Sequence, residues 1–418
     1  MRRITVSTTF SYILMWFITF PNQIIFAQNK PQGANEASKA PFELKDGDRV
    51  VFLGNSLFEN DLQYGYMELA LTTRWPDRDV TFRNIGWSGD NVFGDARSYF
   101  TNPPTAYDLL IEQITKAKPT IVFIAYGGLE AQEGEAGLPR FNEGLNKLLD
   151  KIDGLGAKAL LLSPIPIMSA GSPESLATHN KNLELYAAAI AKAAAARGNQ
   201  FIDIFNPLKE INKNVKLSDN GFHLDETGYY YLAATLENGL GLASPRKEVI
   251  TINVSKHGIK ASTPAKMIDA GKGIANFKFT IYEEYLPLPL PEQNAGIVDN
   301  VRLLKIMRLK KGFYTLTSND AQIITASAKQ WAEGVEIKQG ASFSQARQLR
   351  EMIVKKNDLF FQQYRPLNQT YIIGFRSYEQ GRHKQGLEDL NFIITWLEGQ
   401  IALHRMPKSV MYQLTPVK

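Results

Sequence analysis

The sequence predicts an α/β fold, with a mostly parallel sheet between two layers of helices, followed by a smaller region of strands and helices. Short apolar runs without polar alternation are typical of strands covered on both faces. Helical patterns between such runs favour a parallel sheet sandwiched by helices. The apolar runs lie at residues 50–53, 80–85, 120–126, 158–163 and 201–205.

Helices are expected where apolar side chains recur every three or four residues. One pattern spans residues 138–152 and another spans 183–194, each between two predicted strands. In open sheets of this kind, functional groups gather beyond the carboxyl ends of the strands. The loops that follow the apolar runs are therefore the place to look for a site.

The pattern changes at about residue 246, so we predict one domain over residues 42–245 and a second region over 246–418. Apolar runs at 249–254, 277–282, 301–309, 312–317 and 322–324 predict strands, and Asn319-Asp320 predicts a turn. Pro287, Pro289 and Pro291 indicate an extended bridge. Amphipathic patterns from residue 344 predict two helices, one ending near Pro366 and one before Pro407.

Composition excludes several reaction classes. The 418 residues include no cysteine, which removes thiol nucleophiles, disulfides and Cys-ligated metal sites, and five histidines supply the neutral-pH bases. Residues 28–250 carry 22 basic and 28 acidic side chains, whereas residues 251–418 carry 23 and 14. This asymmetry suggests two regions docked by complementary charge, or an anionic polymer as partner. We find no nucleic-acid motif, and no oligomeric state is indicated.

The N-terminus has the pattern of an export signal. Two arginines precede a short apolar stretch at residues 12–20, and Ala27 offers a cleavage position. A membrane anchor is the alternative, but the stretch is shorter than the ~20 residues that a span requires. We predict a signal peptide at 1–27, a polar linker at 28–41 and a secreted or periplasmic protein with no membrane span after processing.

Four loops carry the chemistry. Gly54-Asn55-Ser56-Leu57 follows the first predicted strand, Gly86-Trp87-Ser88-Gly89-Asp90 the second and Gly127-Gly128-Leu129-Glu130 the third, and Asn220 and His223 lie in a late loop. Ser56 and His223 supply a hydroxyl and an imidazole, the minimum pair for nucleophilic acyl transfer. Ser88 is a rival nucleophile, but Asp90 stands where a Gly-x-Ser-x-Gly motif needs glycine.

These blocks, in this order, resemble the SGNH hydrolase superfamily of GDSL-type esterases, including its secreted bacterial members. The resemblance covers residues 42–242 and implies a flavodoxin-like three-layer fold, ester hydrolysis and neither metal nor organic cofactor. It implies that Ser56 is the nucleophile, that His223 is the base, and that the N–H of Gly89 donates to the oxyanion.

The first block of the family normally has aspartate where Asn55 stands, and two further departures bear on catalysis. The third block normally has an asparagine that donates to the oxyanion, but Leu129 stands there. Loss of one such donor typically costs ~10²–10³ in turnover. The last block normally has aspartate three residues before the histidine, but Asn220 stands there and Asp219 precedes it. An amide in that role can cost ~10⁴. We expect Asp219 or Asn220 to orient the imidazole, and a backbone carbonyl is the alternative.

Further residues are candidates for substrate binding. They share positions near the strand ends or in the segment after residue 364: Asn55, Asp90, Gly128, Glu130, Arg365 and Asn368. For the last two, a network that fastens the helices to the first domain is the favoured interpretation, and reach over Ser56 is the alternative. The sequence thus predicts a secreted serine esterase or acylhydrolase acting on a carbohydrate or other small ester, including polysaccharide esters. The alternative is an impaired or inactive binding protein for carbohydrate on the same fold.

Overall fold

Five parallel strands form the sheet that positions the site, in the order β2-β1-β3-β4-β5. The computed structural model describes residues 42–98, 104–242, 249–255, 257–269, 276–292, 302–319, 321–367, 376, 378 and 383–417. The predicted signal peptide (1–27), the linker residues 28–41, Asp320 and Asn368 lie outside these residues. The strands are β1 (Arg49–Gly54), β2 (Thr81–Asn84), β3 (Ile121–Ala125), β4 (Lys158–Leu162) and β5 (Gln200–Ile202).

The predicted strands of the first domain are confirmed, with one correction at the end of the last. The run 201–205 is not all strand, because β5 ends at Ile202 and a helix begins at Phe205. The Ser163 hydroxyl accepts hydrogen bonds from the backbone N–H groups of Ile204 and Phe205, both at 2.9 Å, and so turns the chain away from the sheet.

Helices cover both faces of this sheet, as predicted, and the strand order is that of flavodoxin-like folds. Two separate apolar clusters fill the two sides: α2 and α7 contribute to one, and α3, α4 and α5 to the other. The helices of this domain are α1 (Ser56–Asp61), α2 (Tyr66–Arg74), α3 (Ala106–Ala117), α4 (Leu138–Gly154), α5 (Pro173–Arg197), α6 (Phe205–Ile211) and α7 (Glu226–Gly239), with 3₁₀ turns η1 (Asp95–Arg97) and η2 (Glu130–Gly137).

The C-terminal region contains two sheets around a third apolar cluster. One has the order β13-β10-β6-β7 and the other β12-β11-β14-β9-β8. The elements are β6 (Val249–Ser255), β7 (Gly258–Ala261), β8 (Ala265–Asp269), β9 (Phe277–Ile281), β10 (Arg302–Met307), β11 (Phe313–Ser318), β12 (Ala321–Ser327), α8 (Ala328–Glu333), β13 (Val335–Ile337) and β14 (Val410–Pro416). Sequence reasoning missed β14, which pairs with both β11 and β9.

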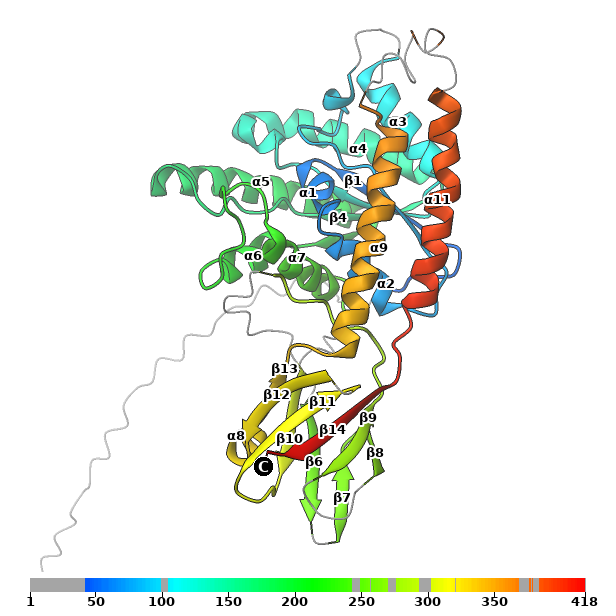
Figure 1. The fold of residues 1–418 in the computed structure, drawn as a ribbon. Helices are drawn as coiled ribbons and strands as arrows, with labels where there is room; N and C mark the ends of the chain where they lie inside the picture. Colours follow the sequence, from blue (N-terminus) through cyan, green and yellow to red (C-terminus); the bar gives the residue numbers. More distant parts are fainter. Residues whose placement is uncertain are drawn as a thin grey trace, which may run out of the picture. The chain divides into compact units, whose positions relative to one another are not determined.

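Two long helices precede β14. They are α9 (Ala341–Tyr364) and α11 (His383–His404), and Figure 1 shows them side by side. Ala346, Leu349 and Ile353 of α9 belong to the apolar cluster on the α2 and α7 side of the parallel sheet. Buried Lys356 also reaches from α9 to Glu68 of α2, with N–O distances of 2.7 and 2.8 Å. Helix α9 is therefore built into the first domain.

Among the helices that the structure describes, none combines the length and the apolar character needed to cross a bilayer.

Candidate active site

Ser56 is the first residue of α1 and lies directly after β1. The side-chain oxygen of Asn55 caps this helix by accepting the N–H of Leu57 at 3.2 Å. Glycine is required at position 54, because a Cβ there would lie 2.5 Å from the carbonyl oxygen of Ala125 on β3. Half-buried Ser56 lines a pocket of about 810 Å³ at the carboxyl ends of the strands. The sequence therefore forms a tight strand–helix turn that presents the hydroxyl to this pocket.

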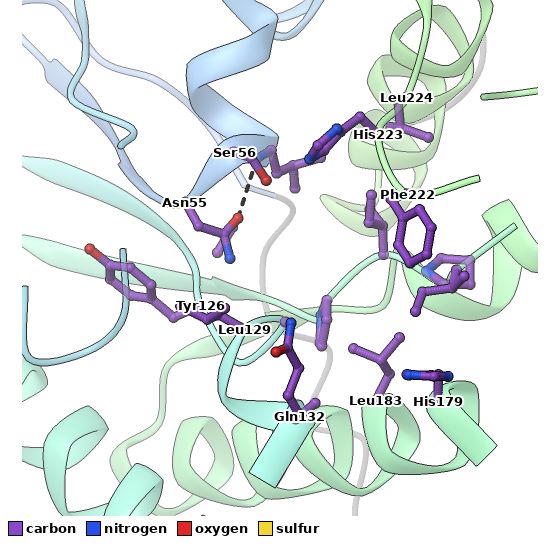
Figure 2. A pocket seen from close by; sticks show the side chains of 18 of the residues that line it. Asn55, Ser56, Tyr126, Leu129, Gln132, His179, Leu183, Phe222, His223 and Leu224 are labelled. Atoms are coloured by element: carbon purple, nitrogen blue, oxygen red, sulfur yellow. Dashed lines mark hydrogen bonds between the residues drawn. The ribbon is translucent and has the colours of Figure 1, made fainter. Parts of the chain in front are cut away.

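His223 reaches the same pocket from the loop that precedes α7. Figure 2 shows its ring on the same rim as Ser56, and both residues line the pocket. The backbone of this loop is held by Ser218, whose hydroxyl donates to the His223 carbonyl at 2.5 Å and accepts the Gly221 N–H at 2.8 Å. No hydrogen bond joins the side chains of Ser56 and His223, both of which the structure describes. The structure thus brings together the two groups that acyl transfer needs.

Asn220 holds the imidazole ring through its amide nitrogen. Its side-chain oxygen accepts the backbone N–H groups of Phe222 at 2.9 Å and His223 at 2.8 Å. The amide nitrogen therefore faces Nδ1 of His223, at 3.3 Å. A donor in this position requires Nδ1 to accept, so the proton of the neutral ring is placed on Nε2. That tautomer cannot take a proton from serine through Nε2.

Asp219 does not orient the ring. Its carboxylate pairs with Lys216 at 2.7 Å, and its side chain is 79% exposed. This pairing raises the pKa of the Lys216 ammonium. Of the two residues considered for the acid position, the structure places Asn220 beside His223 and Asp219 away from it.

The second block contributes Gly89 to the pocket and keeps Asp90 beneath it. Gly89 has a φ of +78°, in the left-handed region that favours glycine. Fully buried Asp90 accepts hydrogen bonds from Nε of Arg97 and from the hydroxyl of Tyr126, both at 2.8 Å. The expectation that Asp90 contacts substrate is therefore corrected: its carboxylate is committed to the support of the loop.

In the third block too, some residues line the pocket and another holds the loops in place. Gly128 and Leu129 line the pocket. Glu130 is buried and accepts the backbone N–H groups of Val92 at 3.1 Å and Gly127 at 2.8 Å. Burial raises the pKa of its carboxyl, and these hydrogen bonds act in the opposite direction. Glu130 is thus a support of two loops, which corrects its expected role in contacting substrate.

Arg365 at the end of α9 supports the second block and does not line the pocket. Its guanidinium lies 3.8 Å from the centre of the Trp87 ring and pairs with Glu59 at 2.9 Å. The same carboxylate oxygen of Glu59 accepts the N–H of Ser88, beside Gly89. These contacts fasten the end of α9 to the loop that carries Gly89.

The rest of the pocket is lined by residues that the sequence analysis did not predict as site residues. Among the residues that the structure describes, no Asp, Glu, Lys or Arg lines this pocket. An apolar wall is formed by Pro164, Ile165, Pro166, Ile167, Leu183 and Phe222, and neutral polar groups by Gln132, Thr178, His179 and Asn182. These residues lie on separate elements and carry no shared motif, so only tertiary packing reveals them. Within the described residues, no cluster of His, Asp and Glu could hold a metal ion.

Comparisons with known proteins bear on the family of the first domain and on the fold. Residues 52–231 match the model of the GDSL-like lipase/acylhydrolase family. The fold is similar to that of a gut microbial diltiazem-metabolizing enzyme, with 18% identity, a TM-score of 0.68, and coverage of 90% of this chain and 99% of that chain. An acetylxylan esterase from Geobacillus stearothermophilus is 18% identical, with a TM-score of 0.38 over 48% of this chain and 98% of its own. No curated protein sequence matches the chain.

Proposed function

We propose that the protein is a serine-dependent carboxylic ester hydrolase, because residues 52–231 match the model of the GDSL-like lipase/acylhydrolase family. The observation that carries the proposal is that Ser56 at the start of α1 and His223 in the loop before α7 line one pocket at the carboxyl ends of the strands. A hydroxyl and an imidazole at one pocket provide nucleophile and base for acyl transfer.

The reaction follows from these positions. The Ser56 hydroxyl attacks the ester carbonyl while His223 takes its proton, and the backbone N–H groups of Ser56 and Gly89 donate to the oxyanion. Collapse of the tetrahedral intermediate expels the alcohol, which takes the proton back from His223. Water then attacks the acyl-serine, again with His223 as base, and releases the carboxylic acid. We expect slow turnover, because Asn220 favours the Nε2–H tautomer of His223.

The pocket lining supports an uncharged ester as substrate. Neutral amide and hydroxyl groups of the lining can bind hydroxyl groups of an alcohol, and its apolar side chains can pack against the carbon framework. An acylated carbohydrate, including an acylated polysaccharide end, and a small neutral ester both fit this description. Acetate release from acetylated xylo-oligosaccharides and from small apolar acetates, compared at equal concentration, distinguishes the two.

We propose that the protein is exported. The support is the sequence of residues 1–27, with its basic start, short apolar stretch and cleavage position after Ala27. Protein recovered from the periplasm or medium of an expressing bacterium should begin at Gln28, as read by N-terminal sequencing. Recovery of uncleaved chain in the cytoplasmic fraction would contradict export.

Turnover of p-nitrophenyl acetate by the wild type, Ser56→Ala and His223→Ala tests the hydrolase proposal. We expect the wild type to exceed both variants, and a fluorophosphonate probe to label the wild type at Ser56 only. Equal background rates for all three proteins, together with no labelling, would refute it.

A carbohydrate-binding protein without activity is the second candidate. Leu129 in the donor position and the amide of Asn220 beside Nδ1 favour it. In that case, calorimetry should detect binding of an acetylated oligosaccharide to wild type and Ser56→Ala alike, with the ester intact afterwards.

A further inference from the structure

Asn55 has an amide whose two ends are used differently. Its oxygen caps α1 by accepting the N–H of Leu57 at 3.2 Å. Its nitrogen, Nδ2, makes no hydrogen bond to any residue within the described ranges. The cap fixes which end of the amide points to the helix, so the N–H₂ group must point the other way.

The free N–H₂ group lies beside the third block. A Cβ placed on Gly128 would lie 3.6 Å from Nδ2 of Asn55, and Gly128 immediately precedes Leu129. Asn55, Ser56, Gly89, Gly128 and Leu129 all line the same pocket. Figure 2 shows the Asn55 nitrogen turned from the capped helix toward the side where Tyr126 and Leu129 lie.

A half-buried donor without a protein partner gains most from an acceptor on a bound molecule. Here the sequence differs from the family pattern at two positions that lie close together in the structure. The first block has Asn55 in place of aspartate, and the third has Leu129 in place of the donor asparagine. Aspartate at position 55 would cap the helix equally well, but only asparagine also offers an N–H₂ group.

We propose that Nδ2 of Asn55 is the third oxyanion donor, in the role that Leu129 cannot fill. The inference rests on the proposed ester hydrolysis. As the serine oxygen bonds to the carbonyl carbon, the carbonyl oxygen becomes negative and accepts hydrogen bonds from the N–H groups of Ser56 and Gly89 and from Asn55. The donor has moved from the third block to the first, and the oxyanion site keeps three donors.

Asn55→Asp tests this, because it preserves the cap and replaces the donor with an acceptor. With p-nitrophenyl acetate we expect kcat to fall by ~10²–10³ with little change in KM, and the thermal unfolding midpoint to stay near that of the wild type. Asn55→Ser is the neutral control: its hydroxyl also caps a helix, but it adds no charge and is too short to replace the amide nitrogen. It should show a similar fall in kcat.

A double variant places a donor at position 129, where the family has its asparagine. Asn55→Asp combined with Leu129→Asn should recover at least about tenfold in kcat over Asn55→Asp alone, since one donor is worth ~10²–10³. A fall of less than about tenfold in either single variant would overturn the proposal, and so would absence of recovery in the double variant. Ser56→Ala decides ester hydrolysis separately, so failure of this inference and failure of the proposed function give different results.

Discussion

Replacement of Asn220 by aspartate should restore the hydrogen-bond acceptor that His223 lacks at Nδ1. In the structure, the amide nitrogen of Asn220 faces Nδ1 at 3.3 Å, while the amide oxygen accepts two backbone N–H groups. An aspartate in the same conformation keeps both backbone hydrogen bonds with one oxygen. Its other oxygen then faces Nδ1, which favours the Nδ1–H tautomer and leaves Nε2 free to take the serine proton.

The size of the effect follows from the two changes at Nδ1. A hydrogen bond from the ring to a charged carboxylate contributes about 1.5–3 kcal/mol, and each 1.36 kcal/mol in the barrier is about tenfold in rate. Correction of the tautomer adds to this, up to the ~10⁴ that an amide in the acid position can cost. Because His223 is exposed to solvent, we expect kcat to rise by ~10²–10³, below that limit.

Initial rates with p-nitrophenyl acetate, at saturating substrate and neutral pH, measure this effect. Asp219→Asn is the matched control, since it changes the neighbouring carboxylate that pairs with Lys216 and should leave kcat unchanged. An Asn220→Asp protein that unfolds at the wild-type temperature but has a kcat within about threefold of the wild type would refute the reasoning.

Three further predictions concern the supports of the site. Arg365→Ala should lower kcat about three- to tenfold and the free energy of unfolding by about 1–2 kcal/mol, because the Trp87 stack and an ion pair are lost; unchanged kcat in steady-state assays would contradict its action on the Gly89 loop. Lys356→Met should lower the free energy of unfolding, measured in urea, by about 3–5 kcal/mol, because it leaves the Glu68 carboxylate buried without its cation. The double variant Lys356→Met, Glu68→Leu should recover most of this free energy. Burial raises the pKa of Asp61 well above 3.8, so the folded state binds its proton more tightly and wild-type stability falls as pH rises through that pKa. Asp61→Asn should therefore match the wild type below pH 3.8 and exceed it in unfolding free energy at neutral pH; a constant difference across the pH range would contradict the shift.

Much of the fold could be predicted because its signals are local. Continuous apolar runs marked every strand of the parallel sheet, since a strand covered on both faces needs apolar side chains at each position. The error at residues 201–205 has a non-local cause: a hydroxyl from the end of β4, Ser163, captures two backbone N–H groups and starts α6. Strand β14 was missed because its partners β9 and β11 are distant in sequence.

The candidate site was partly predictable for a related reason. Loops at the carboxyl ends of parallel strands converge, so Ser56, Gly89 and His223 could be assigned to one rim from their places in the sequence. Whether a polar side chain faces the pocket or the interior depends on its neighbours. Asp90 and Glu130 lie next to lining residues, yet both are buried as supports of the loops.

The sequence by itself determined the parallel α/β sheet, the order of the blocks and the pair of Ser56 and His223, because residue type and short-range periodicity decide these. Only the tertiary structure decided how the side chains are turned. In the folded protein, the amide nitrogen of Asn220 faces Nδ1 of His223, and the amide nitrogen of Asn55 faces the third block. Backbone N–H groups take the oxygen of each amide, and the positions of those groups exist only once the loops have folded.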